Sequence, residues 1–311
     1  MNNQPLLILG TGALATLFAA RLSAQGHDVT ILGTWEAGLD ALERDGARLI
    51  DSNGRESVQR VRVIRDPKRV TGIRFAFVLL KAWQTERAAR QLAECLAPDG
   101  LAVTLQNGLG NDDMLAQSLG RERVALGVTT TGATLLAPGL ARAGGEGVVS
   151  LEAHPRMGDV ESMLRSARFT VEVVADAKSL VWGKLVINAA INPLTALLRV
   201  SNGELLNRPS ARELMRALAE ETAAVASAQN IRLPFANPVE AAETVAHKTA
   251  ENHSSMLQDV LRGAPTEIDA ICGAVTRIGE EHGVATPVNR ACWQLVRAVA
   301  DGGEGAVVRF T

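Results

Sequence analysis

The chain has 311 residues, of which 47% are hydrophobic and 21% charged, and its formal net charge is −2. This balance is typical of a globular protein, the length favours two domains, and the charge provides no basic field that would attract nucleic acid. No apolar run is as long as a transmembrane helix, which needs about 18 residues. The N-terminus lacks the basic segment of a signal peptide.

The cysteines and histidines do not form a recognisable metal or disulfide pattern. Cys95, Cys272 and Cys292 are odd in number, widely spaced and set in apolar surroundings. This argues against a disulfide framework and favours a reducing, cytoplasmic location. The five histidines form no closely spaced pair on a helix face, so we expect no metal site.

The first half of the chain alternates short apolar runs with helical patterns. A buried strand that ends at Gly10, a helix that ends at Gly26 and a second β-rich run form a βαβ unit. Further strands are predicted at residues 74–81, 101–108 and 169–176, helices at 84–96 and 159–167, and β-rich runs that extend or flank the sheet at 123–136 and 145–152. This order predicts an α/β fold with a Rossmann-type doubly wound sheet.

From about residue 177 onward, only helical patterns remain. They lie at residues 177–198, 211–229, 238–261, 266–283 and 288–302. We therefore predict a dinucleotide-binding Rossmann domain at residues 1–176 and an all-α domain, which carries the substrate and catalytic groups, at residues 177–311.

A glycine-rich loop follows the first strand and opens the first helix. Its sequence GTGALA has the GxGxxA form of a dinucleotide fingerprint. Gly10 permits the tight turn, Gly12 lets a pyrophosphate approach the backbone, and the small Ala15 allows close packing of helix and strand. The positive end of the helix then faces the phosphates. We predict that the cofactor is held here by Gly10, Thr11, Gly12, Ala13, Leu14 and Ala15.

The end of the second strand, where the cofactor ribose is expected, carries no charged residue at its tip. The sequence there is Gly33-Thr34-Trp35-Glu36, with neither an acid for the ribose of NAD nor an arginine for a 2′-phosphate. Thr34 can hydrogen-bond to either form of the ribose, and Trp35 is equally consistent with covering adenine or with packing. These residues leave NADH and NADPH open.

Polar residues also follow two later strands. Lys81 and Asn107 come at strand ends, where ligands collect in open α/β sheets. The alternatives are an ordinary surface lysine and a plain Asn-Gly turn at residues 107–108.

A stripe of polar residues interrupts an otherwise apolar helix at residues 177–198. Lys184, Asn188 and Asn192 are four residues apart, and at about 100° per residue they lie on one face. Pro193 should kink the helix directly after them. The stripe is either the wall of a cleft or a solvated face, and the apolar flanking residues favour a cleft.

Farther along the chain, Ser255 and Glu267 add a hydroxyl and a carboxylate. Thr266 as an N-cap with Asp269 three residues later predicts a helix that starts here. A negative charge at a helix start is also explained by the helix dipole, so Glu267 by itself does not indicate a site.

Seven motifs together resemble the ketopantoate reductase (2-dehydropantoate 2-reductase) family. They occur in the family's order through nearly the whole chain: LLILGTGALA, LLKAWQ, LQNGLGN, WGKLVINAAINPLTAL, NGELL, ENHSSMLQD and TEIDAICG. The resemblance implies an N-terminal Rossmann domain, a helical C-terminal domain and NADPH-dependent reduction of 2-dehydropantoate to (R)-pantoate, on the route to pantothenate and coenzyme A.

The resemblance also implies roles for individual residues. Lys184 is expected to be the general acid and Glu267 its charged partner or a substrate-binding group. The expected substrate contacts are Asn107, Asn188, Asn192 and Ser255, with Lys81 and Asn107 beside the nicotinamide ribose and the phosphates. Many family members carry an arginine where Thr34 stands, so NADPH is the expected cofactor and NADH is not excluded.

Two alternative functions are consistent with part of this pattern. The first is a paralogous NAD(P)H-dependent reductase of another 2-oxo or imino acid. The second is a non-catalytic dinucleotide sensor, which would have no use for a lysine paired with a carboxylate. The expected partner is a small 2-oxo acid rather than nucleic acid or a membrane, and a homodimer is compatible with the sequence.

Overall fold

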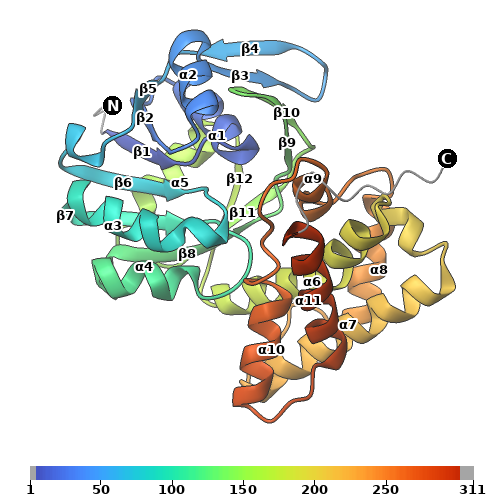
Figure 1. Cartoon of the computed structure of the whole chain (residues 1–311). Coiled ribbons are helices and arrows are strands. Elements are labelled where there is room, and N and C mark those ends of the chain that lie inside the picture. Colours follow the sequence, from blue (N-terminus) through green and yellow to red (C-terminus); the bar gives the residue numbers. More distant parts are fainter. Residues whose placement is uncertain (1–4, 302–311) are drawn as a thin grey trace. The chain divides into compact units, whose positions relative to one another are not determined.

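The computed structural model describes residues 5–301. The described part divides into two compact units, the first formed by residues 5–106 and 110–177 and the second by residues 107–109 and 178–301 (Figure 1). Residues 107–109 therefore group with the second unit although the chain on both sides of them belongs to the first. Gly302, the last residue of the final predicted helix, lies outside the described residues.

The first unit contains an eight-stranded sheet with the order β12-β11-β8-β7-β6-β1-β2-β5. The strands are β1 (Leu6–Leu9), β2 (Val29–Leu32), β5 (Arg62–Ile64), β6 (Ile73–Val78), β7 (Leu96–Thr104), β8 (Val124–Thr129), β11 (Val148–Glu152) and β12 (Thr170–Val174). Strands β8 to β5 are parallel, while β11 is antiparallel to β8. This confirms the predicted Rossmann-type sheet, and its strand order reverses direction between β1 and β6, where a ligand crevice is expected.

Helices bury both faces of this sheet. They are α1 (Ala13–Ser23), α2 (Glu36–Asp45), α3 (Thr85–Cys95), α4 (Asn111–Leu119) and α5 (Met157–Ser166). Alternate residues of β1 point to opposite faces, so Leu6 and Ile8 pack in one core with α1 and α5. Leu7 and Leu9 pack in a second core with α3 and α4. Burial on both faces explains the continuous apolar run of β1.

A second, smaller sheet was not predicted from the sequence. It has the order β4-β3-β10-β9. Its strands are β3 (Ala47–Ile50), β4 (Glu56–Gln59), β9 (Ala133–Ala137) and β10 (Leu140–Ala143). Of the β-rich run at residues 123–136, β8 thus extends the main sheet and β9 belongs to the small one. Residues of β3 and β10 share a core with α1, which explains why α1 is apolar on nearly all sides.

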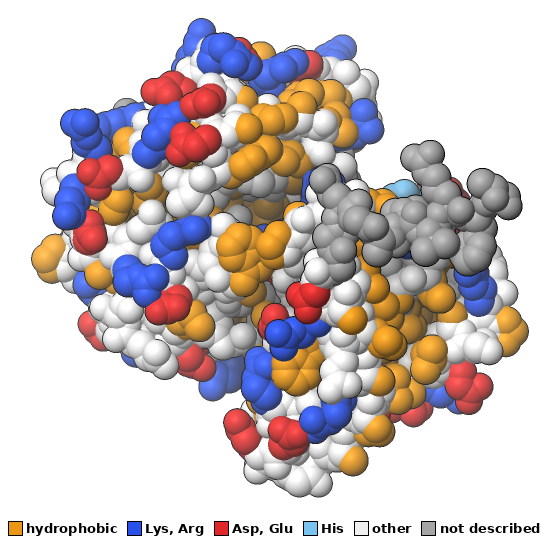
Figure 2. All heavy atoms as spheres, viewed as in Figure 1, with side chains coloured by type: hydrophobic (Ala, Val, Ile, Leu, Met, Phe, Trp, Pro, Cys, Tyr) orange, Lys and Arg blue, Asp and Glu red, His pale blue; other side chains and the backbone are white. Residues whose placement is uncertain are grey.

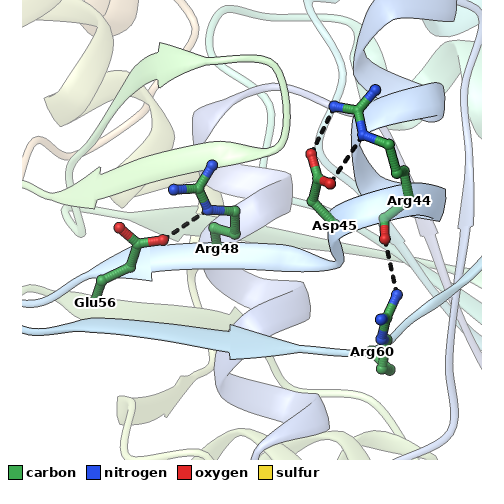
Figure 3. A network of polar contacts seen from close by, with 5 residues as sticks. All are labelled: Arg44, Asp45, Arg48, Glu56 and Arg60. Carbon is green, nitrogen blue, oxygen red and sulfur yellow. Dashed lines mark hydrogen bonds and ion pairs between the residues drawn. The ribbon is translucent and has the colours of Figure 1, made fainter.

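Charged side chains border the small sheet on its solvent side. Arg48 on β3 pairs with Glu56 on β4 at 2.6 Å, and Arg60 donates to the carbonyl of Arg44 at 2.9 Å (Figure 3). Exposed contacts of this kind contribute little to stability because water and salt screen them. On the face drawn in Figure 2, positive and negative side chains are interspersed rather than gathered by sign.

The second unit is helical in the described residues. Its elements are α6 (Ala177–Leu198), η4 (Asn202–Leu205), α7 (Pro209–Ala228), α8 (Pro238–Lys248), α9 (Ser255–Leu261), α10 (Cys272–Glu281) and α11 (Pro287–Asp301). Helix α6 contributes Trp182, Leu185 and Val186 to the core. By length and composition α6 alone among the described helices could cross a membrane, but 67% of its most apolar window is buried inside the structure.

The helix predicted at residues 238–261 is in fact two helices, α8 and α9. The segment between them bonds to η4 instead of continuing the helix. The backbone N–H of Asn202 donates to the carbonyl of Asn252 at 3.0 Å, and that of Gly203 donates to Ala250 at 3.1 Å. The single-helix prediction was wrong because these partners are about 50 residues away in the chain and leave no local signal.

The helix predicted to start at Thr266 begins later, at Cys272. Asp269 does not fold back as a capping residue, since its carboxylate accepts a hydrogen bond from Trp293 at 2.6 Å. The carbonyl of Ala270 accepts from the backbone N–H of Leu109 at 3.1 Å. The Thr266 hydroxyl does accept from the backbone N–H of Ile268 at 3.4 Å, but residues 267–271 form a turn instead of the first turn of a helix. The predicted helix start was therefore wrong, because the tertiary bonds of Asp269 and Ala270 hold this segment as a turn.

Candidate active site

The glycine loop lies at the carboxyl end of β1, and its geometry leaves room for a dinucleotide. Gly10 has φ +130, and a Cβ there would lie 2.7 Å from the carbonyl oxygen of Leu79 at the end of β6. Only glycine therefore permits this close approach. Gly12 is the residue before α1, and a Cβ there would meet no atom within 4 Å. The backbone beside the helix N-terminus is thus open, which fits a pyrophosphate.

The remaining predicted residues of the loop support this arrangement. Thr11 is buried, and Ala13 and Leu14 are the half-buried first residues of α1. Ala15 is fully buried, which agrees with the close packing of helix and strand predicted for this small residue.

The end of β2 presents Thr34 without a neighbouring arginine in sequence. Thr34 is exposed, and Trp35 packs its ring against Gly38 at the start of α2, where a Cβ would lie 2.4 Å from the ring. The packing interpretation of Trp35 thus has structural support, while 43% of the residue stays exposed. Arg65 follows β5, the strand beside β2.

Arg65 is engaged by the acidic face of α2. It bonds to Glu36 at 2.9 Å and to Glu43 at 3.0 Å, and it also pairs with Asp40. Arg65, which follows the strand next to β2, is therefore already paired with carboxylates.

Lys81 lies at the carboxyl end of β6 and is half-buried. Its carbonyl accepts a hydrogen bond from Gln84 at 2.9 Å and one from the side chain of Gln106 at 3.4 Å. The same Gln106 amide donates to Thr85 at 2.8 Å, and Thr85 bonds to Asn111 at 2.8 Å. This network, which the sequence did not reveal, fixes the ends of β6 and β7 at the predicted cofactor-binding edge.

The polar stripe on α6 is not a solvated face. Lys184 and Asn188 are half-buried, and Asn192 is only 7% exposed. Helix α6 continues through Pro193 to Leu198, so the stripe stays on one continuous element.

Lys184 and Glu267 form an electrostatic pair within the second unit. Desolvation by burial lowers the pKa of Lys184 from 10.5 to about 8, while the charge of Glu267 opposes this shift. Glu267 is 5% exposed. A buried carboxylate requires a charged or hydrogen-bonding partner, and Lys184 supplies a positive charge. Lys184 and Glu267 therefore interact electrostatically, and their catalytic roles stay predictions.

Asn107 lies beside the same carboxylate. Its side-chain amide donates to Glu267 at 3.1 Å. The neighbouring Gly108 has φ +82, and a Cβ there would be 2.5 Å from the carbonyl oxygen of Ala270, to which the backbone N–H of Leu109 donates. Residues 107–109 thus pack against the turn at residues 267–271. A plain Asn-Gly turn, the alternative interpretation of residues 107–108, would not need these contacts.

Two adjacent serines have different surroundings. Ser254 is buried and caps α9, since its Oγ accepts from the backbone N–H of Leu257 at 3.0 Å. Ser255, the predicted substrate contact, is the exposed first residue of α9.

Comparison with known proteins places the chain in a family. The models "Ketopantoate reductase PanE/ApbA" and "Ketopantoate reductase PanE/ApbA C terminal" match residues 6–156 and 176–300. A 2-dehydropantoate 2-reductase of Archaeoglobus fulgidus is 38% identical, with 97% of this chain and 100% of that protein covered. The chain belongs to the ketopantoate reductase family. A 2-dehydropantoate 2-reductase of Halobacterium salinarum is 34% identical over 96% of this chain and 99% of its own length.

Solved structures show the same fold. A ketopantoate reductase family member from Ralstonia eutropha JMP134 has a TM-score of 0.90 and 29% identity, covering 96% of this chain and 99% of that one. A D-mandelate dehydrogenase solved with NADH and anilino(oxo)acetate has a TM-score of 0.89 and 24% identity, covering 96% and 98% of the two chains. The latter shares the fold.

The family resemblance inferred from seven motifs is confirmed, and the structure explains two of them. The NGELL motif forms η4, which holds the segment before α9. In the TEIDAICG motif of this ketopantoate reductase family member, the turn before α10 carries Glu267 and seats Asn107.

Proposed function

We propose that this chain reduces 2-dehydropantoate to (R)-pantoate with NADPH, on the route to pantothenate and coenzyme A, and that Lys184 is the general acid. The observation that carries the proposal is the electrostatic pairing of Lys184 with the buried Glu267. Lys184 lies on α6, and the same face of this helix presents Asn188 and Asn192. Membership of the ketopantoate reductase family supports the reaction and the cofactor.

The glycine loop fits the cofactor because the space beside Gly12 is open and the N-terminus of α1 faces it. The residues that hold it are those of the loop (residues 10–15), with Thr34, Lys81 and Asn107. When bound, the reduced nicotinamide supplies the hydride that goes to the C2 carbonyl carbon. The loop glycines bind the phosphates through backbone N–H groups.

Lys184 stabilises and protonates the carbonyl oxygen of the substrate. As hydride reaches C2, negative charge develops on that oxygen, and an ammonium group donates to it and then transfers a proton. A pKa of about 8 makes Lys184 a stronger acid than an ordinary lysine, which has a pKa of 10.5. Glu267 limits this shift and thereby keeps Lys184 protonated at neutral pH.

The neutral polar groups recognise the rest of the substrate. Each amide of Asn188 and Asn192 offers both donors and an acceptor, and the Ser255 hydroxyl offers one more of each. These donors and acceptors suit the carboxylate and the distal hydroxyl of 2-dehydropantoate. Asn107 donates to Glu267 and thereby fixes the orientation of that carboxylate.

We assign the two parts of the function to the two predicted domains. We assign cofactor binding to residues 1–176 and catalysis and substrate recognition to residues 177–311, with Asn107 as the exception that serves both. We place the activity in the cytoplasm, where the buried cysteines stay reduced. A homodimer stays a prediction.

The test is to follow loss of the absorbance of NADPH and of NADH, each with 2-dehydropantoate, for the wild type and for Lys184→Ala. We expect rapid oxidation of NADPH by the wild type and a kcat lower by about 10²–10⁴ for the variant, because a positioned general acid contributes about that factor. Unchanged NADPH affinity of Lys184→Ala serves as the control for folding. Oxidation of NADH only would contradict the cofactor assignment, and oxidation of neither would contradict the reaction.

A further inference from the structure

A pair of buried hydroxyl groups connects α6 to the start of α9. The Oγ atoms of Thr195 and Ser254 are 2.7 Å apart, although the residues are 59 positions apart in the chain. Thr195 is fully buried and Ser254 is 6% exposed. Buried hydroxyl groups are costly unless they are hydrogen-bonded, so this contact is part of the packing of the two helices.

The partners of the two hydroxyls determine the direction of the hydrogen bonds. Thr195 Oγ1 lies 3.0 Å from the carbonyl oxygen of Ile191 and 2.9 Å from that of Asn192, and carbonyls only accept. The single hydrogen of Thr195 therefore goes to these carbonyls, and Ser254 donates to Thr195. Ser254 Oγ in turn accepts from the backbone N–H of Leu257 at 3.0 Å. A continuous chain of hydrogen bonds thus runs from the first turn of α9 to the backbone of Asn192.

The two ends of this chain of hydrogen bonds lie next to two groups that are proposed to contact substrate. Asn192 is the last residue of the polar stripe, and its own carbonyl is one of the acceptors. Ser255, an exposed residue, directly follows Ser254 at the start of α9. We propose that Thr195 and Ser254 are positioning residues, which hold the Ser255 hydroxyl at a fixed place relative to the Asn192 amide. This proposal rests on the proposed function, in which both groups contact substrate.

Capping of α9 by Ser254 does not by itself account for the contact between Ser254 and Thr195. Ser254 would satisfy the N–H of Leu257 without Thr195, as capping serines do elsewhere. The other side of the segment before α9 is already bound to η4, because the side chain of Asn202 donates to Thr249 at 2.9 Å. The hydroxyl pair adds the connection to α6. Since α9 has only 7 residues, its first turn depends on such external connections for its position.

The variants Thr195→Val and Thr195→Ser separate this role from packing. Valine keeps the shape and removes the hydroxyl, whereas serine keeps the hydroxyl. The matched control is Thr222→Val on α7, since Thr222 is equally buried and its Oγ1 donates to the carbonyl of Leu218 at 2.7 Å within one helix. Steady-state kinetics gives KM for 2-dehydropantoate and for NADPH, and amide hydrogen exchange reports on Leu257.

We expect Thr195→Val to raise KM for 2-dehydropantoate by about three- to tenfold, the effect of one buried hydrogen bond. KM for NADPH should not change, kcat should change by less than about twofold, and the Leu257 amide should exchange faster. Thr195→Ser should restore the wild-type values, and Ser254→Ala should act in the same direction as Thr195→Val without adding to it in the double variant.

Two results would overturn the proposal. If the Leu257 amide exchanges faster in Thr195→Val while KM for 2-dehydropantoate stays unchanged, the pair only stabilises α9. If Thr222→Val raises KM equally, the effect is general loosening of the helical unit. A wild type that does not reduce 2-dehydropantoate contradicts the proposed function instead, and unchanged exchange in Thr195→Val then also excludes the coupling between α6 and α9.

Discussion

At the scale of single residues, the central feature is a lysine held in an environment that disfavours its charge. Burial pushes the pKa of Lys184 down, and Glu267 pushes it back up, with a result of about 8. The protonated, proton-donating form therefore predominates at neutral pH and disappears as the pH rises through about 8. The balance of two opposing effects is what gives the acid its working range.

This balance predicts the pH dependence of the reaction. We expect log kcat to fall with unit slope above a pH of about 8. Glu267→Gln removes the charge that raises the pKa, so the fall should begin at lower pH. The control is Asp269→Asn, an exposed carboxylate on the same turn that bonds to Trp293. A pH profile that is identical in the wild type and Glu267→Gln would contradict the electrostatic pairing.

Thr34 provides a second test at this scale. The nearest basic residue in the strand order, Arg65, is already bonded to acids of α2, so Thr34→Arg would add a new cation at the predicted ribose position. A charged hydrogen bond is worth about 1.5–3 kcal/mol, and we expect KM for NADPH to fall by roughly 10–100-fold relative to that for NADH.

Thr34→Gln, which is long and uncharged, is the matched control for this change. If both KM values change equally in Thr34→Arg, residue 34 does not face the 2′-phosphate.

At the scale of elements, short segments are held by partners far away in the sequence. The loop after β7 lies on the turn before α10, and the segment before α9 lies on η4. In both places the local sequence predicted a regular structure or a plain turn. The backbone groups of Ala250, Asn252 and Ala270 instead bond to distant segments, so the predicted helices are interrupted or begin later.

Two glycines in the β7–α4 loop test the seating of Asn107. Gly108 and Gly110 both have φ +82, but only at Gly108 would a Cβ collide, 2.5 Å from the Ala270 carbonyl oxygen. We expect Gly110→Ala to destabilise by about 1 kcal/mol, the cost of the backbone conformation alone. Gly108→Ala should destabilise by about 1–3 kcal/mol more, because of the collision.

Chemical denaturation of both variants gives the difference, and kcat tests its consequence. Because Gly108→Ala displaces Asn107 from Glu267, kcat should fall in that variant and not in Gly110→Ala. Equal stability and activity of the two variants would argue that the loop is not seated on the turn.

At the scale of the whole molecule, cofactor binding and proton transfer are assigned to different compact units. The glycine loop belongs to the first unit, while Lys184, Glu267 and Asn107 belong to the second. Losing one function should therefore leave the other measurable. Ligand binding to the folded state alone stabilises it by about 2.7 kcal/mol at a concentration 100-fold above Kd, which makes thermal unfolding a suitable readout.

Gly12→Val is the variant that separates folding from cofactor binding. Gly12 has φ −80 and open space around it, so valine should leave the Tm without cofactor nearly unchanged. The same side chain would fill the space of the pyrophosphate, and the increase in Tm on adding NADPH should be lost. Gly10→Val should instead lower the Tm itself, since its Cβ would meet Leu79. Lys184→Ala should keep the full increase, and a persistent increase in Gly12→Val would contradict the phosphate site.

The sequence by itself determined those features that depend on local patterns. The periodicity of apolar residues defined β1, α1 and α6, and the glycine spacing located the loop at residues 10–15. The spacing of four residues placed Lys184, Asn188 and Asn192 on one helix face. The order of motifs identified the family. The elements, the loop and the helix face follow from chain geometry within a few turns, which requires no knowledge of distant contacts, whereas the family follows from the resemblance of its motifs.

Only the tertiary structure decided which distant groups meet. Glu267 lies 83 residues from Lys184 in the sequence, and neither the small sheet packed on α1 nor the Thr195–Ser254 pair has a local signature. The strands of the small sheet are short, and β4 is largely exposed, so their apolar patterns are weak. Their positions, and the lowered pKa of Lys184, arise from burial and hydrogen bonding that exist only once the chain has folded.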